Sequence, residues 1–282
     1  MDFIKLCIEL ILELLGLQRL NTGYRDTPPR KRKPIENKRL CVCLHEWGGY
    51  PLSRHKHIND NICDWDCGIK YQLERFSNYT GNIDVKLNVT LSDAYRYKDM
   101  DYVAALCDKI SSVPNRGMDF SGYSHSFREL QGGPNCYVLL TNSSVNAIQN
   151  EFIDSYINYM ESNPDVGMLG ISCCSKCYQS LRQNNFTPHL QSFFLLTTLS
   201  VLEEIVALNS NKFPGEGIIN KQLLIRRGEI KISQLALKLG YKLAVVTEHN
   251  VVKFDNNPAN WTLPQGDYRI HTKNPNTINP LK

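Results

Sequence analysis

Polar residues that could bind a sugar nucleotide follow several apolar, strand-like runs of the sequence. His45 ends the first such run and precedes a Trp-Gly-Gly-Tyr segment, where glycines allow close approach of the backbone and an aromatic ring can stack on a base. In open α/β sheets ligands bind outside the carboxyl ends of the strands, so this position is a candidate for donor binding. An ordinary glycine-containing turn is the alternative interpretation of residues 45–50.

A second cluster, residues 115–119, reads Asn-Arg-Gly-Met-Asp and precedes a helix-like segment. It combines a guanidinium that could bind a diphosphate, a flexible backbone and a carboxylate that could bind hydroxyl groups. A plain helix-capping loop rarely needs so many special residues, so we predict a donor-binding loop here. The residues concerned are Asn115, Arg116, Gly117 and Asp119.

A third cluster follows the apolar run 137–140, where Asn142, Ser143 and Ser144 supply short polar side chains but no carboxylate. We predict that they face the donor. The other acidic pair of interest, Asp64 and Asp66, precedes a predicted helix and is interpreted as a capping segment.

A fourth cluster holds His189, Gln191 and Ser192, with Glu229 further along the chain. A histidine, an amide and a carboxylate among apolar neighbours could orient an acceptor hydroxyl and take its proton. We predict that the first three contact the acceptor. A histidine that is simply satisfied inside the core is the alternative.

Strand-like and helix-like segments alternate along the chain from residue 38 onward. Such alternation predicts an α/β fold with a mostly parallel central sheet flanked by helices. The predicted strands are residues 40–45, 85–91, 137–141 and 166–172; the predicted helices are residues 68–79 and 151–161, and residues 102–111 are either.

The N-terminal region differs from the rest. Residues 3–17 are apolar except for charges at Lys5, Glu9 and Glu13, which argue against a spanning segment and predict an amphipathic helix. We therefore divide the chain into a helix (1–20), a basic Pro-rich linker (21–37) and a glycosyltransferase-like domain (38–282). Residues 1–36 either contact anionic lipid at a membrane surface or pack on the domain or on a partner subunit.

The composition limits the classes of function. The net charge of +4 is small for 282 residues and concentrates in residues 30–33, so nucleic-acid binding is not expected. The ten cysteines fall largely in apolar runs and are interpreted as small buried residues. A cytoplasmic protein, peripheral on a membrane, is the predicted location.

These motifs, in this order, resemble the rhamnan-synthesis (RgpF-like) branch of GT-A glycosyltransferases, which build bacterial and viral surface polysaccharides. The matching segments are residues 115–119, 137–145, 189–194 and 228–241. The resemblance implies a GT-A-like fold, a nucleotide-sugar donor and a glycan acceptor. In GT-A enzymes the strand end that resembles residues 141–144 usually carries an Asp-x-Asp signature for a divalent cation, Mn²⁺ or Mg²⁺. Here neutral groups stand instead, and they bind such a cation far more weakly.

The predicted reaction is displacement with inversion at the anomeric carbon. Glu229 is the first candidate for the base that deprotonates the acceptor, and Asp119 is the second. A non-catalytic sugar-nucleotide-binding or scaffold domain is the main alternative. A nucleotidyltransferase is a further alternative, disfavoured because residues 45–50 contain no cation that could hold a phosphate.

Overall fold

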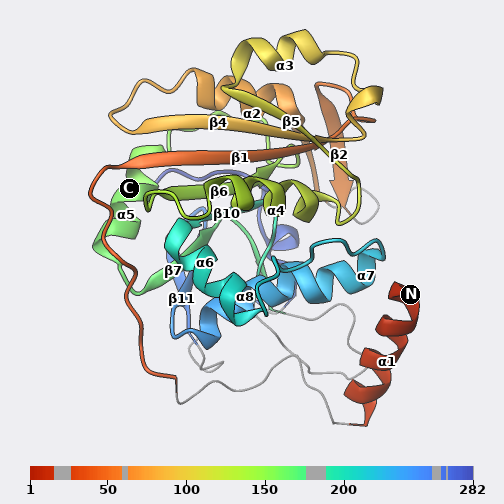
Figure 1. Cartoon of the computed structure of the whole chain (residues 1–282). Helices are drawn as coiled ribbons and strands as arrows, with labels where there is room; N and C mark the ends of the chain where they lie inside the picture. Colours follow the sequence, from red (N-terminus) through yellow and green to blue (C-terminus); the bar gives the residue numbers. More distant parts are fainter. Residues whose placement is uncertain (16–26, 59–62, 176–188, 256–261, 265, 282) are drawn as a thin grey trace.

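The computed structural model describes residues 1–15, 27–58, 63–175, 189–255, 262–264 and 266–281 (Figure 1). An eight-stranded sheet has the order β12-β11-β7-β10-β6-β1-β4-β5. Only β10 and β12 run against the other six strands. The strands are β1 (Arg39–Trp47), β4 (Asp84–Ser92), β5 (Lys109–Val113), β6 (Tyr137–Asn142), β7 (Val166–Gly170), β10 (Phe194–Thr198), β11 (Lys242–Val246) and β12 (Val251–Phe254).

Helices cover both faces of this sheet. On one face lie α2 (Ile69–Ser77), α3 (Met100–Leu106) and α5 (Ile153–Ser162). On the other lie α4 (Asp119–Leu130), α6 (Leu199–Leu208) and α8 (Lys231–Lys238), the last preceded by α7 (Lys221–Leu224) and a π-helical turn, η2 (Ile225–Ile230). This arrangement confirms the predicted α/β class with a mostly parallel central sheet flanked by helices.

Side-chain alternation along β1 explains how the sheet is buried on both faces. Val42 and Leu44 pack with α2 and α5, whereas Cys41 and Cys43 pack with α4 and α6. Successive side chains of a strand point to opposite faces, so every residue from Leu40 to Leu44 contributes to a core. The structure thus places these two cysteines as small buried residues, as predicted.

The order of the strands defines where a ligand would bind. After β1 the chain builds β4 and β5 on one side, and then crosses to place β6 on the other side of β1. The carboxyl ends of β1 and β6 therefore flank a topological switch point, the usual position of ligands in open α/β sheets.

A hairpin of β2 (Arg54–Ile58) and β3 (Cys63–Cys67) packs over this switch point. Asp64 and Asp66 lie exposed on β3, where both contact His55, and Gly68 rather than an acidic residue stands before α2. The interpretation of Asp64–Asp66 as a helix cap was therefore wrong, because the segment finds its backbone partners in β2.

The N-terminal helix, α1 (Asp2–Leu14), is present as predicted, and the segment before β1 is bound to the body of the protein. Arg30 pairs with Glu204 (2.9 Å), and its backbone amide donates to Gly240. The buried Arg32 donates to the carbonyl of Val166 (2.7 Å). Residues 27–37 thus follow the surface rather than forming a free linker in the described part, while residues 16–26 lie outside it.

Membrane spans and metal-binding clusters can be judged only for the residues that the structure describes. In the described ranges no helix is long and apolar enough to cross a membrane, and no group of three or more His, Cys, Asp or Glu could hold a metal ion. The proposed boundaries between helix, linker and domain remain predictions.

Candidate functional site

The third sequence cluster and Asp119 meet at the carboxyl ends of β1 and β6. The side-chain amide of Asn142, the last residue of β6, donates to the carboxylate of Asp119 in the first turn of α4 (2.7 Å). Ser143 and Ser144 follow at once, the first buried and the second half-buried. Residues from separate parts of the sequence thus form one polar patch.

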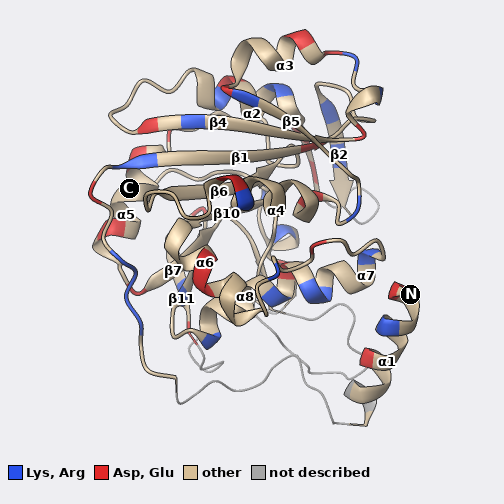
Figure 2. Cartoon of the chain, viewed as in Figure 1, with Lys and Arg blue, Asp and Glu red and all other residues tan. Residues whose placement is uncertain are grey.

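Two cations of β2 bind the hydroxyl groups of this patch. Arg54 donates to the Ser143 hydroxyl and Lys56 donates to the Ser144 hydroxyl, and the donor–acceptor distance is 2.6 Å in both hydrogen bonds. Residues 54 and 56 share one face of the strand because side chains alternate, and Figure 2 shows the cations of β2 in blue. Arg54 also pairs at 3.4 Å with Glu46, whose side chain is only 2% exposed.

Burial shifts the pKa of the charged groups here. The Lys56 ammonium has its pKa lowered, first by desolvation and then by the nearby charge of Arg54. The Glu46 carboxyl has its pKa raised by burial, although Arg54 acts in the opposite direction. The site therefore holds positive charge at an energetic cost, and an anion bound beside Lys56 would reduce that cost.

His45 lies behind this patch rather than on its surface. Its Nδ1 is 3.1 Å from the Thr90 hydroxyl and its Nε2 is 3.4 Å from that of Ser92, and the ring is buried, which lowers its pKa. A Cβ on Gly122 of α4 would stand 2.4 Å from His45 Nδ1, so only glycine permits this packing. His45 positions β1 against α4.

The loop of residues 115–119 lies at the edge of the same site. The Asn115 amide donates to Asp93 (3.3 Å), which also accepts from the indole of Trp47 (2.8 Å). Arg116 is exposed, and Gly117 has a φ of 111° that disfavours side chains. Met118 adopts φ 48° and ψ −127°, a strained conformation of the kind that is concentrated at binding sites.

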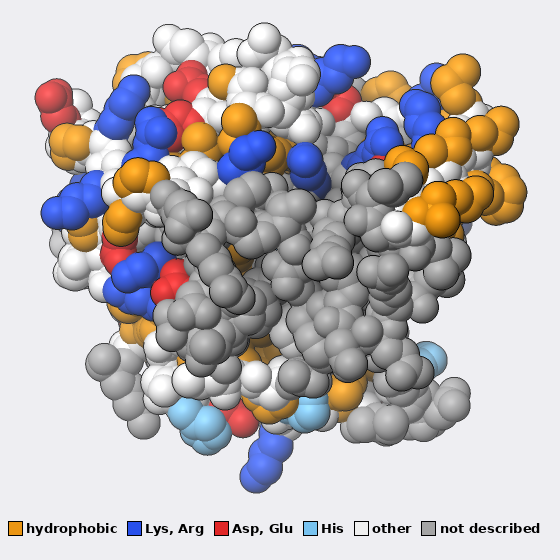
Figure 3. All heavy atoms as spheres, turned by 90° about the horizontal axis from the view of Figure 1, so that it is seen from below, with side chains coloured by type: hydrophobic (Ala, Val, Ile, Leu, Met, Phe, Trp, Pro, Cys, Tyr) orange, Lys and Arg blue, Asp and Glu red, His pale blue; other side chains and the backbone are white. Residues whose placement is uncertain are grey.

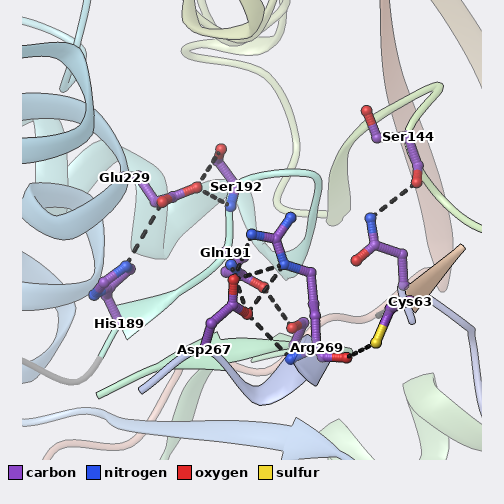
Figure 4. Close-up of polar contacts among 10 residues, drawn as sticks. Cys63, Ser144, His189, Gln191, Ser192, Glu229, Asp267 and Arg269 are labelled. Atoms are coloured by element: carbon purple, nitrogen blue, oxygen red, sulfur yellow. Dashed lines mark hydrogen bonds and ion pairs between the residues drawn. The ribbon is translucent and has the colours of Figure 1, made fainter. Parts of the chain in front are cut away.

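The predicted acceptor residues form a second polar group, shown in Figure 4. One oxygen of Glu229 accepts from both the backbone amide (2.9 Å) and the hydroxyl (2.8 Å) of Ser192. The other oxygen is 3.6 Å from Nε2 of His189, whose side chain is completely buried while that of Glu229 is 17% exposed. Glu229 thus lies between the buried ring of His189 and Ser192.

The charge state of Glu229 follows from these contacts. Burial raises its pKa, but the hydrogen bond and the charge of His189, together with two hydrogen bonds from Ser192, outweigh burial and leave the pKa below its usual value. These contacts therefore favour the ionised form of the Glu229 carboxyl.

The C-terminal segment closes this side of the site. Asp267 accepts from the amide of Gln191 (3.3 Å) and pairs with Arg269, while the carbonyl of Arg269 accepts from the thiol of Cys63 (3.5 Å) (Figure 4). Asn276 donates to the carbonyl of Ser144 (2.9 Å). Residues 266–276 thus connect the β2–β3 hairpin to the end of β6.

The two polar groups are joined through the start of β10. Phe194 of β10 pairs with Thr141 of β6, and the carbonyl of Phe193 accepts from the backbone amide of Asn142 (3.2 Å). Tyr123 of α4 donates to the carbonyl of Ser192 (2.8 Å). Asp119, Asn142, Ser192 and Glu229 therefore lie along one edge of the sheet.

Sequence reasoning missed Arg54, Lys56, Asp267 and Arg269. The alternation of cations in Arg54-His-Lys56 was a usable signal, since residues two apart share a strand face. Arg54 also stands near the carboxyl end of β1, so the lack of a cation in residues 45–50 does not disfavour a nucleotidyltransferase. The C-terminal segment carries no comparable pattern.

No protein-family model and no curated protein matches the sequence. One solved structure has a similar backbone trace: that of CMP:2-keto-3-deoxy-manno-octonic acid synthetase complexed with CTP. The match covers 79% of this chain and 95% of that one, with a TM-score of 0.43 and 11% sequence identity. A likeness at this level says nothing of substrate.

Proposed function

We propose that this protein is a glycosyltransferase that moves a sugar from a nucleotide-sugar donor to a hydroxyl group of a glycan acceptor. The observation that supports the proposal is that the pairs Asp119–Asn142 and Glu229–Ser192 both lie at the carboxyl edge of the sheet, where the backbone amide of Asn142 donates to Phe193, the neighbour of Ser192. The first pair offers groups for a donor at the switch point, and the second offers an ionised carboxylate beside it.

The donor would bind between the ends of β1 and β6. Asp119 and Asn142 lie where they can contact sugar or ribose hydroxyl groups, and the strained loop of residues 115–119 borders the same space. Arg116 is exposed and free to turn toward a diphosphate. Trp47 and Tyr50 contact each other edge to face, with ring centroids 4.9 Å apart, so they form one aromatic surface at the end of β1.

The reaction we propose is a single displacement with inversion. The acceptor hydroxyl oxygen attacks the anomeric carbon, the bond from that carbon to the diphosphate oxygen breaks, and the nucleoside diphosphate leaves with both electrons. The proton of the hydroxyl passes to the carboxylate of Glu229, whose side chain is 17% exposed. Asp119 is the second candidate for the base.

The test is to incubate the full chain with a panel of nucleotide sugars and to measure release of nucleoside diphosphate and free sugar, first without acceptor and then with oligosaccharides. We expect slow hydrolysis of at least one donor and loss of that activity in Glu229→Gln. A protein that binds a nucleotide sugar but releases no sugar under any condition would be a scaffold domain, and the proposal would be wrong.

Nucleotidyl transfer is the second candidate function, and the positions of Arg54 and Lys56 favour it. In such a reaction an oxygen of the sugar substrate attacks the α-phosphorus of a nucleoside triphosphate, the bond to the β-phosphate breaks, and a nucleotide sugar and inorganic pyrophosphate are formed. A pyrophosphate assay with each of the common triphosphates separates the two reactions, because glycosyl transfer releases nucleoside diphosphate and no pyrophosphate.

A further inference from the structure

The end of β6 offers poor ligands for a divalent cation. The side chains there are the amide of Asn142 and the hydroxyl groups of Ser143 and Ser144, which are neutral. Both hydroxyl groups already accept a hydrogen bond from a cation, Arg54 or Lys56. A divalent cation at this point would be repelled by the positive charges of Arg54 and Lys56 in a largely buried setting.

We infer that Arg54 and Lys56 bind the donor diphosphate directly, at the place where GT-A enzymes that carry an Asp-x-Asp signature hold a metal ion. The inference rests on the proposed function and names a further binding site within it. A guanidinium fork matches two phosphate oxygens, and an ammonium supplies a compact charge beside it.

The surroundings of the two cations fit this role. The Arg54 guanidinium is 11% exposed, and its Nε is buried without a hydrogen-bond partner among the described residues. Lys56 is half-buried, and burial lowers its pKa. Glu46 neutralises part of the charge of Arg54 from behind, at 3.4 Å, and leaves the Ser143 side of the guanidinium toward the site. An incoming diphosphate would replace the hydroxyl groups of Ser143 and Ser144 as the hydrogen-bond acceptor of Arg54 and Lys56. Each cation would then exchange a neutral partner for a charged one.

The experiment is calorimetric titration of the full chain with UDP, GDP, CDP, ADP and dTDP, and with inorganic pyrophosphate, in EDTA and then in Mn²⁺. We expect at least one nucleoside diphosphate to bind equally well in both buffers. Lys56→Gln and Arg54→Gln should each weaken that binding by about tenfold or more, as expected for loss of a charged hydrogen bond. Lys86→Gln, an exposed lysine on β4, is the matched control.

Arg54→Lys guards against misfolding, since it keeps the charge opposite Glu46 and should lose less affinity than Arg54→Gln. Binding that requires Mn²⁺, that is unchanged in both glutamine variants, or that is absent from the wild type would overturn the inference. Diphosphate binding that depends on both cations, without any sugar transfer, would instead refute the proposed function and leave the site standing. Sugar transfer by the wild type, together with unchanged diphosphate binding in the variants, would support the proposed function and refute the diphosphate site at Arg54 and Lys56.

A second and independent observation concerns α1, which docks on the protein by its charged side. Glu9 is buried and pairs with Arg226 (3.0 Å) and with Arg227 of η2, and the Asp2 carboxylate accepts from the amide of Ile219 (2.8 Å). The opposite side of the helix is apolar and faces outward, as the orange atoms at the right of Figure 3 show. Its exposed residues are Phe3, Ile4, Ile8, Ile11 and Leu15.

We propose that this apolar stripe inserts into the surface of an anionic lipid membrane. The five side chains fall on one helix face, opposite Glu9, and the exposed Ile219 beside α1 extends the patch. Exposed cations border it, namely Lys5 on α1 itself and Lys221 on α7, against which α1 packs. An apolar stripe with a basic border is typical of helices that lie in the membrane interface.

The structure also shows how to test this proposal without unfolding the protein. Truncation before residue 36 would remove Arg30 and Arg32, which are bound to the body, so point variants are preferable. We expect the full chain to sediment with vesicles of phosphatidylcholine and phosphatidylglycerol, and to bind vesicles of phosphatidylcholine alone more weakly.

The double variant Ile8→Ser/Ile11→Ser should lose most of this binding, whereas Leu208→Ser, at an exposed leucine of α6, should retain it. Circular dichroism checks that each variant keeps its fold. If wild type stays in the supernatant, or if light scattering shows a dimer that the double variant abolishes while vesicle binding is unchanged, the stripe contacts protein and the lipid proposal is wrong.

Discussion

The two halves of the candidate site use charge in opposite ways. At the end of β6, cations from β2 hold neutral hydroxyl groups, so Arg54 and Lys56 keep positive charge available to an incoming anion. At η2, Glu229 is held by a buried histidine and two donors of Ser192, so negative charge is fixed in one orientation. The first half is suited to bind a leaving group, and the second to accept a proton.

Loss of the Glu229 carboxylate should give the largest effect. Glu229→Gln keeps the shape of the side chain but removes proton acceptance, so we expect kcat to fall by roughly 10² to 10⁴ with little change in KM for the donor. Steady-state kinetics with a donor found in the nucleotide-sugar panel measure both constants. A variant that keeps most of its kcat would show that Glu229 only orients Ser192.

Asp119→Asn tests whether the other carboxylate belongs to the donor half. It removes the charge that accepts from Asn142, so we expect KM for the donor to rise by roughly tenfold or more and kcat to fall less than in Glu229→Gln. The same kinetic measurements give the answer. If kcat falls further than in Glu229→Gln, the roles of the two carboxylates are exchanged.

Ser144→Asp would place a negative charge in the cationic half of the site, at the end of β6. The new carboxylate would pair with Lys56 and compete with the diphosphate, so affinity for a nucleoside diphosphate in EDTA should fall by about tenfold. Titration with and without Mn²⁺ measures this, and partial recovery in Mn²⁺ is expected because a carboxylate is a better ligand for that ion. Ser77→Asp, at the exposed C-terminal end of α2, serves as control.

The smallest expected effect is on stability in acid. The pKa of Glu229 is lowered in the folded protein, so its ionisation stabilises the fold above the pKa of the unfolded chain, and this stabilisation is lost as pH falls through the lower, folded value. The melting temperatures of wild type and Glu229→Gln should therefore differ most near neutral pH and converge in acid. Thermal melts across pH 3–7 at about one-unit steps follow this change. A constant difference would mean that Glu229 stabilises the fold by packing alone.

Much of the fold could be predicted because its core elements carry periodic apolar patterns. The runs around Leu139 and Val89 became buried central strands, and residues 102–111, left open between helix and strand, contain the end of α3 and the start of β5. Adjacent strand ends then brought Asn142 close to Asp119, since position on a sheet edge follows from strand order.

The rest of the site depended on segments without such patterns. The β2–β3 hairpin is short and polar, so Asp64 and Asp66 were interpreted as a cap and Arg54 was missed. Residues 266–276 reach the site through single contacts, such as Asp267 with Gln191. Pairings between distant polar residues leave no periodic trace in one sequence.

The π-helical turn η2 places Glu229 in a way that a regular helix would not. A π-helical turn commonly contains one residue more than the α-helical turn that it replaces, and each residue of an α-helix advances by about 100°. Deleting one residue between Arg227 and Glu229 would allow a regular helix and swing the carboxylate away from Ser192, while Arg226 kept its bond to Glu9. The proposed role of Glu229 thus depends on the π-helical turn, because a regular helical turn at this place would change the direction of its carboxylate.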